Sequence, residues 1–322
     1  MDSLEPSQGI PYSQQVSDIS AMPIVATTRY CAVFGHPIKH SASPAMQNAA
    51  LATLGLDWRY LAFEVHPDHL REAIAGAKAM RFIGLNLTVP HKLIAPELVD
   101  ALDDSAKNYG AVNTIRFEAK DPFGNWQPLA QFPSDADSEV RSVGFNTDAD
   151  AIARALREDL GLKPRGASVL LLGAGGAGRV AALKLVAEGV KQLHLVNRTA
   201  GKAETVAADI KRQFPKAKVS IGYPNVPVDL ILNATSLGLK PDDALPLDEK
   251  QYPLKLARLV YDMIYRPAET PLLRAARTAG CRAANGLGML LYQGAKALEL
   301  WSGKAAPVAV MRQALEKNIY GK

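Results

Sequence analysis

The chain has 322 residues, which suits two domains of ordinary size better than one small core. Hydrophobic residues make up 48% and charged residues 21%, the balance of a globular protein, and no stretch approaches the ~18 apolar residues of a membrane helix. The net charge is +5, yet Lys and Arg are spread along the chain without a run of like charges. Composition therefore argues against a membrane or nucleic-acid partner and fits anionic small-molecule ligands.

The two cysteines, Cys31 and Cys281, lie far apart and in no metal-ligand spacing. We therefore expect reduced thiols in a cytoplasmic protein and no metal site. Residues 1–26 contain no Lys or Arg, whereas a signal or transit peptide needs early positive charge. Residues 1–27 are expected to be a disordered N-terminal extension or the remnant of an expression tag.

Strands and helices alternate in the first part of the chain. Apolar runs and alternation predict strands at residues 30–34, 60–65 and 82–89, and helical periodicity predicts helices at residues 45–54 and 69–80. Ser43 suits the N-cap of the first helix, because Pro44 follows it at the first helical position. These elements predict an α/β domain over residues 28–148, with residues 118–143 as a surface hairpin or loop.

A second α/β pattern follows a helix that leads from Asp148 to Pro164. Strands are predicted at residues 168–172, 193–196, 228–232 and 259–263, and helices at residues 176–188 and 289–300. Strand, glycine turn, helix and strand in this order are typical of a Rossmann-type domain, here residues 149–287.

The turn after the strand at residues 168–172 is GAGGAG, a complete G-x-G-x-x-G. Its glycines permit a tight turn, let backbone amides approach a pyrophosphate and allow the helix to pack against the strand. We expect the following residues of this loop to contact a dinucleotide: Gly173, Ala174, Gly175, Gly176 and Ala177.

The end of the next strand indicates which dinucleotide binds. An NAD site places Asp or Glu there for the ribose 2′-hydroxyl, but this chain has Asn197, Arg198 and Thr199, with Lys202 one turn later. Arginine offers charge-assisted hydrogen bonds to a 2′-phosphate, and its planar face stacks on adenine. The sequence therefore predicts NADP, unless Arg198 is merely a solvated loop residue.

Polar residues also gather where the other short strands end: Ser41, Ser43, Asn86, Thr88, Lys92, Asn113, Thr114, Asn146 and Asp148. Each could have a structural role alone, but together these hydroxyls and amides suit a polyhydroxylated ring with a carboxylate. Lys92 near Asp148 could donate a proton at neutral pH. His40 and His91 lie nearby in sequence, and we expect both to be structural or exposed to solvent.

Nine ordered motifs resemble the shikimate dehydrogenase family over nearly all of residues 30–304. They are FGHPIKHSASP (34–44), NLTVPHK (86–92), GAVNT (110–114), GFNTD (144–148), GAGGAG (173–178), NRT (197–199), NATS (233–236), YDMIY (261–265) and NGLGML (285–290) followed by Gln293. The resemblance implies an N-terminal α/β substrate domain, a Rossmann-type NADP-binding domain, and a cleft between them. It also implies that C-terminal helices in residues 288–322 pack back on the first domain.

The same resemblance implies roles for particular residues. Lys92 and Asp148 would form the catalytic pair that protonates the oxygen at C3 of 3-dehydroshikimate, in aromatic amino acid biosynthesis. The substrate would be held by Ser41, Ser43, Thr88, Asn113, Tyr265 and Gln293. Besides the loop and the run from Asn197 to Lys202, the cofactor would be bordered by Asp104, Met263 and Gly286. We expect a monomer or a homodimer.

Some features depart from the family pattern. Residues 117–143 are longer than the usual hairpin, residues 1–27 have no counterpart, Ala149 replaces a common glycine, and Tyr109 stands where an aliphatic residue is usual. A quinate/shikimate dehydrogenase or a related paralogue is an alternative, and a non-catalytic NADP-binding sensor is a more remote one. The Lys92 and Asp148 pair argues against a sensor. A glutamyl-tRNA reductase-like protein is disfavoured because no nucleophilic cysteine is in a matching context.

Overall fold

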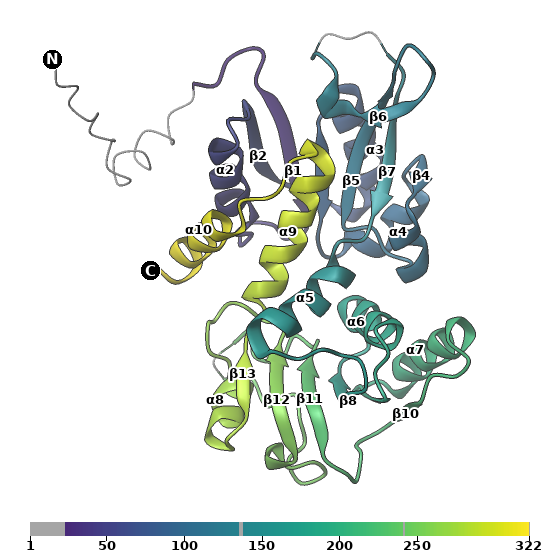
Figure 1. Cartoon of the computed structure of the whole chain (residues 1–322), viewed down its shortest axis with the longest axis vertical. Helices are drawn as coiled ribbons and strands as arrows, with labels where there is room; N and C mark the ends of the chain where they lie inside the picture. Colours follow the sequence, from purple (N-terminus) through teal and green to yellow (C-terminus); the bar gives the residue numbers. More distant parts are fainter. Residues whose placement is uncertain (1–22, 135–137, 241, 322) are drawn as a thin grey trace, which may run out of the picture.

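The structure, a computed structural model, describes residues 23–134, 138–240 and 242–321. Within these ranges the chain forms two β-sheets, one in each half of the molecule, with helices α5 (Asp148–Leu160) and α9 (Leu287–Ser302) between them (Figure 1). This confirms the predicted α/β class with a substrate-side domain and a Rossmann-type domain. No helix of the described residues is long and apolar enough to cross a membrane.

The first sheet is mixed and has the strand order β2-β1-β3-β5-β7-β4, with β6 paired to β5. Its strands are β1 (Arg29–Gly35), β2 (Trp58–Glu64), β3 (Gly84–Leu87), β4 (Ala101–Leu102), β5 (Thr114–Lys120), β6 (Trp126–Pro128) and β7 (Val140–Phe145). Strand β1 runs parallel to β2 and β3, whereas β5 is antiparallel to β3 and β7. The central strands β1, β3, β5 and β7 are mostly buried. Lys92 follows the end of β3, and Asp148 follows the end of β7.

Short helices connect these strands. The α-helices are α2 (Ser43–Thr53), α3 (Leu70–Ala79) and α4 (Asp104–Tyr109), and the 3-10 helices are η2 (Pro67–His69), η3 (His91–Leu93), η4 (Ala95–Glu97) and η5 (Leu129–Gln131). Helix η3 carries Lys92 shortly after β3, so the NLTVPHK motif places this lysine at the carboxyl end of a central strand.

The second sheet is parallel throughout, in the order β10-β9-β8-β11-β12-β13. Its strands are β8 (Ser168–Leu172), β9 (Gln192–Val196), β10 (Val219–Ile221), β11 (Val228–Asn233), β12 (Ala257–Asp262) and β13 (Arg282–Ala284). Its helices are α6 (Gly176–Ala187), α7 (Ala200–Gln213), η6 (Leu254–Leu256) and α8 (Pro271–Thr278). The strand order reverses between β8 and β11, the crevice where such folds bind a nucleotide.

One large cluster of buried hydrophobic side chains extends through both halves, beside a smaller cluster within each half. Helix α5 packs along α9, and the last helix, α10 (Val308–Tyr320), packs on α2 of the first half. The cluster of buried side chains runs from Tyr60 and Trp301 through Ile152 and Leu298 to Leu171 of β8. Arg179 of α6 adds a polar link, because its guanidinium donates to the Tyr109 carbonyl at the end of α4.

Residues 118–143, where a surface hairpin or loop is expected, do begin as an antiparallel hairpin of β5 and β6 with its turn at residues 121–125, but the strands at both flanks are part of the first sheet. Strand β5 continues through Lys120 and β7 begins at Val140, so these residues belong to the sheet. Glu118 is only 3% exposed and accepts hydrogen bonds from the guanidinium groups of Arg116 and Arg141. This buried ion pair explains how charged residues occupy a strand whose composition indicated a loop.

The N-cap predicted at Ser43 is also wrong. Helix α2 begins at Ser43 itself, Ala42 occupies the cap position, and no side chain caps the helix there. The expected extension of residues 1–27 falls largely on residues 1–22, which lie outside the described residues; Val25 and Thr28 form a turn next to β1.

Candidate active site

A cavity of about 310 Å³ lies between the two halves of the molecule. Its polar lining on the side of the first sheet comes from His40, Ser41, Ser43, Asn86, Thr88, Lys92 and Asp148. On the other side it is lined by Ala177, Met263, Tyr265, Gly286 and Gln293. Thus ten of the residues proposed for the substrate, the cofactor or proton transfer border one cleft, and Asn86 joins them.

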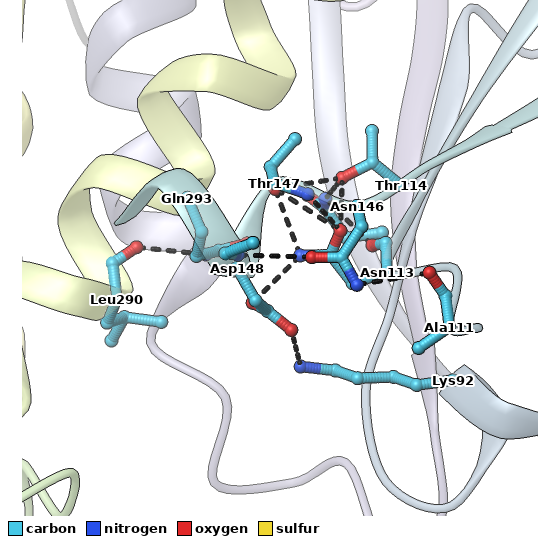
Figure 2. A network of polar contacts seen from close by, with 11 residues as sticks. Lys92, Ala111, Asn113, Thr114, Asn146, Thr147, Asp148, Leu290 and Gln293 are labelled. Atoms are coloured by element: carbon cyan, nitrogen blue, oxygen red, sulfur yellow. Dashed lines mark hydrogen bonds and ion pairs between the residues drawn. The ribbon is translucent and has the colours of Figure 1, made fainter. Parts of the chain in front are cut away.

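Lys92 and Asp148 form a close ion pair at this cleft. The Lys92 ammonium donates to Asp148 Oδ2 at 2.7 Å, with side-chain exposures of 31% for the lysine and 9% for the aspartate (Figure 2). Lys92 comes from η3 after β3, and Asp148 is the first residue of α5. A partly exposed ammonium held by a buried carboxylate is placed to exchange a proton with a ligand in the cleft.

Asn113 orients the carboxylate of this pair. Its amide nitrogen donates to Thr147 Oγ1 and to Asp148 Oδ1, each at 2.9 Å, and its amide oxygen accepts from the Thr147 backbone N–H at 2.7 Å. Asn113 is 1% exposed and is not among the residues that line the cavity. Both N–H groups are already used within the protein, so its contact with a substrate stays a prediction.

The other proposed substrate residues border the cleft from both sides. Burial raises the pKa of the Tyr265 phenol, so this side chain is a neutral hydrogen-bonding group at ordinary pH. Tyr320 of α10 donates to the Tyr265 carbonyl at 2.7 Å and holds this segment in place. Gln293 donates one amide N–H to Leu290 of its own helix, which leaves its amide oxygen for the cleft.

The glycine loop leaves space for a dinucleotide. A Cβ on Gly178 would meet the Gly173 carbonyl at 2.1 Å, and one on Gly173, whose φ is +103°, would meet the Ala234 backbone at 2.9 Å. A Cβ on Gly175, in contrast, would meet no atom within 4 Å. Two glycines are thus required by the protein's own packing, whereas Gly175 faces the open space at the start of α6 that a pyrophosphate would fill.

The residues at the end of β9 fit the adenosine end of NADP. Asn197 accepts from the Ala174 backbone N–H at 3.0 Å and so joins the glycine loop to the next loop. Arg198 and Lys202 are exposed, and neither side chain has a hydrogen-bond or ion-pair partner among the described residues. Two free cations beside the loop are suited to a 2′-phosphate.

The remaining cofactor candidates differ in their placement. Gly286 lies against Met263, whose carbonyl would be 2.0 Å from a Cβ, so only glycine fits there. Asp104 does not line the cleft; its side chain is 86% exposed and pairs with Lys107 at 3.1 Å. The structure gives Asp104 a surface role, and its contact with a cofactor stays a prediction.

The apolar lining of the cleft, including Ile38, Met289 and Leu290, was assigned no role from the sequence. Asn86 was named there only as a polar candidate, and His40, expected to be structural or exposed to solvent, also lines the cleft. Among the described residues, no group of three or more His, Cys, Asp or Glu side chains is placed to hold a metal ion.

A glycine loop with free cations on one side of the cleft and a Lys–Asp pair on the other define an NADP-dependent oxidoreductase. Family models agree: the shikimate dehydrogenase substrate binding domain matches residues 33–115, shikimate / quinate 5-dehydrogenase matches 155–235, and the shikimate 5'-dehydrogenase C-terminal domain matches 286–316. The chain belongs to the shikimate dehydrogenase family.

Individual relatives cover nearly the whole chain. The shikimate dehydrogenase (NADP(+)) of Desulforamulus reducens is 39% identical over 91% of this chain and 96% of its own length. The crystal structure of shikimate dehydrogenase from Aquifex aeolicus has a TM-score of 0.75 at 35% identity, covering 91% of this chain and 99% of that one. That of Thermus thermophilus in complex with NADP(H) and shikimate has a TM-score of 0.73 at 33% identity, covering 90% and 99%.

Proposed function

We propose that Lys92 and Asp148 carry out the proton transfer in the shikimate dehydrogenase reaction, the reversible NADPH-dependent reduction of 3-dehydroshikimate to shikimate. The observation that carries this proposal is the 2.7 Å contact between Lys92 Nζ and Asp148 Oδ2 in the cleft. NADPH, when bound, supplies the hydride. Lys92 donates a proton to the forming alkoxide, and Asp148 holds the ammonium in position and stabilises its charge.

The other proposed contacts follow from the resemblance to the shikimate dehydrogenase family, and for most of these residues their place at the cleft supports them. The substrate is held by Ser41, Ser43, Thr88, Asn113, Tyr265 and Gln293. The cofactor is bordered by Asp104, Met263, Gly286, the glycine loop and the residues from Asn197 to Lys202. In this arrangement residues 28–148 bind substrate, residues 149–287 bind cofactor, and residues 288–322 support the first domain.

Replacement of Lys92 tests the assignment. Lys92→Ala should reduce kcat for shikimate oxidation by roughly 10²–10⁴-fold, because the group that takes up the proton in this direction, and donates it in the reduction, is lost. Its dissociation constant for NADP should stay unchanged, since Lys92 lies on the opposite side of the cleft from the glycine loop. Lys78→Ala, which removes a surface lysine paired with Asp100 in the same domain, is the control and should keep wild-type kcat. Wild-type turnover by Lys92→Ala would refute the assignment.

Substrate and cofactor choice are tested by a steady-state assay of shikimate and quinate, each with NADP and NAD. We expect turnover with shikimate and NADP to exceed every other pair. A preference for quinate would favour the quinate/shikimate alternative, and no turnover with any pair would favour a binding protein.

We also propose that the protein is cytoplasmic and is a monomer or a homodimer. Two free, buried cysteines, Cys31 and Cys281, support a reducing compartment. Light scattering of the purified chain distinguishes one copy from two.

A further inference from the structure

Tyr60 is a buried residue of β2 that stands behind the cleft. It is 1% exposed, and its hydroxyl donates to Asn86 Oδ1 at 2.7 Å. Asn86 of β3 lines the cleft, whereas Tyr60 does not line it. Tyr60 therefore contacts a cleft residue from a neighbouring part of the same sheet.

The surroundings of Asn86 fix which way its amide points. The amide nitrogen contacts the Asn113 carbonyl at 3.3 Å and Thr114 Oγ1 at 3.0 Å. A carbonyl oxygen only accepts, so the nitrogen faces Asn113 and the amide oxygen faces Tyr60. Both N–H groups are used within the protein. Asn86 consequently presents only an acceptor to the cleft, and it matches a ligand hydroxyl that donates.

The hydrogen bonds continue from Asn86 to the Lys92–Asp148 pair. Because Thr114 Oγ1 accepts from Asn86, its own proton goes to Asn113 Oδ1 at 3.3 Å or to Thr147 Oγ1 at 3.2 Å. Thr147 Oγ1 in turn lies 3.3 Å from Asn113 Oδ1, so both routes lead to Asn113, which donates to Asp148 (Figure 2).

All these donations run in one direction, from the hydroxyl of Tyr60 to the carboxylate of Asp148. In such a chain each group that accepts a hydrogen bond becomes a better donor to the next. The two asparagines transmit this effect well, since each accepts at the amide oxygen and donates at the amide nitrogen.

We infer that Tyr60 is a positioning residue of the reaction: its hydroxyl sets the amide of Asn86 toward the substrate and begins the hydrogen-bond chain that ends on Asp148. The inference rests on the proposed function, because its readout is turnover of shikimate.

Tyr60→Phe removes the hydroxyl and keeps the ring. We expect KM for shikimate to rise roughly five- to fiftyfold, the range for a buried acceptor left without its donor, while KM for NADP stays unchanged. The matched control is Tyr252→Phe. Tyr252 is 0% exposed, and its hydroxyl bonds to the Val228 N–H and the Leu256 carbonyl in the second sheet. This control should lower the melting temperature without changing either KM.

Thr114→Val breaks the same chain at a later link and keeps the side-chain shape. It should raise KM for shikimate as Tyr60→Phe does, and it serves as the test if Tyr60→Phe fails to fold. The double variant should raise KM for shikimate by less than the product of the two single effects, because both substitutions interrupt the same hydrogen-bond chain. The inference would be overturned if the double variant raised KM by the full product of the two single effects, or if Tyr60→Phe kept the wild-type KM for shikimate. Either result would leave the proposed function standing. A wild-type enzyme inactive on shikimate would overturn the proposed function as well.

Discussion

Arg198 lies exposed at the carboxyl end of β9, with its guanidinium free of protein partners among the described residues. Its charge is available to a 2′-phosphate, and such charged hydrogen bonds contribute roughly 1.5–3 kcal/mol. Arg198→Ala should therefore raise KM for NADP about ten- to a hundredfold and leave KM for NAD nearly unchanged. Arg282→Ala, an exposed arginine on β13, is the control. An equal rise in KM for NADP and for NAD would show that Arg198 does not bind the 2′-phosphate.

His91 is 0% exposed, and neither ring nitrogen has a hydrogen-bond partner among the described residues. Burial lowers the pKa of His91, the nearby Val65 carbonyl opposes this in part, and the neighbouring His36 and His66 lower it further. The unfolded chain therefore binds a proton near pH 6.5 while the folded chain stays neutral to a lower pH. The contribution of His91 to the free energy of unfolding is therefore complete above pH 6.5 and is lost as the pH falls below this value.

His91→Phe should remove this dependence. In urea unfolding between pH 7 and 5, the free energy of unfolding of the variant should fall less steeply, by up to about 1.4 kcal/mol per pH unit. His69→Gln, at an exposed histidine, should retain the wild-type slope. An unchanged slope in His91→Phe would mean that His91 binds its proton equally well in the folded and the unfolded protein.

Single residues differed in how far the sequence revealed them. Arg198 could be predicted because its meaning depends only on its place after a strand. Tyr60 gave no signal, since a tyrosine in an alternating strand is ordinary, and its role depends on Asn86 and Thr114, which are distant in sequence. The expectation that His91 is structural or exposed is consistent with its burial.

The start of helix α6 depends on two glycines for different reasons. Gly178→Ala would push a Cβ into the Gly173 carbonyl, so we expect lower stability and loss of NADP binding together. Gly175→Ala meets no protein atom, so it should fold as the wild type does and weaken only NADP binding. Gly76→Ala is the control, because Gly76 lies on α3 in the other half and a Cβ there would meet only the end of the Met80 side chain, at 4.0 Å. Calorimetric titration with NADP and thermal unfolding separate these outcomes.

Elements with simple periodicity were predictable, and those stabilised by tertiary contacts were not. The strand at residues 168–172 is β8 with the same bounds, because buried parallel strands have continuous apolar sequence. Helix α5 ends at Leu160 rather than near Pro164, since Gly161 takes a left-handed conformation with φ of +66°. Strands β5 and β7 were missed because they contain charged residues, which in the structure form ion pairs of Arg116 and Arg141 with the buried Glu118.

At the scale of the whole molecule, the continuous core predicts one cooperative unfolding transition. Trp301 of α9 is 1% exposed, donates to the Ile115 carbonyl at 2.9 Å and belongs to the cluster that reaches β8. Trp301→Ala should cost roughly 3–5 kcal/mol and lower a single melting temperature for both halves. Phe123→Ala, at a ring 89% exposed, should have little effect. Two separate calorimetric peaks, with only one of them shifted, would contradict a shared core.

Helices α5 and α9 join the two halves, and the whole second sheet comes from the uninterrupted stretch of chain between them (Figure 1). In genetic terms this stretch is a cassette bounded by two junctions. Recombination among relatives could exchange a complete nucleotide module without cutting any strand of the first sheet. The packing of α5 along α9 sets the condition for success, because both helices would have to be inherited from the same parent.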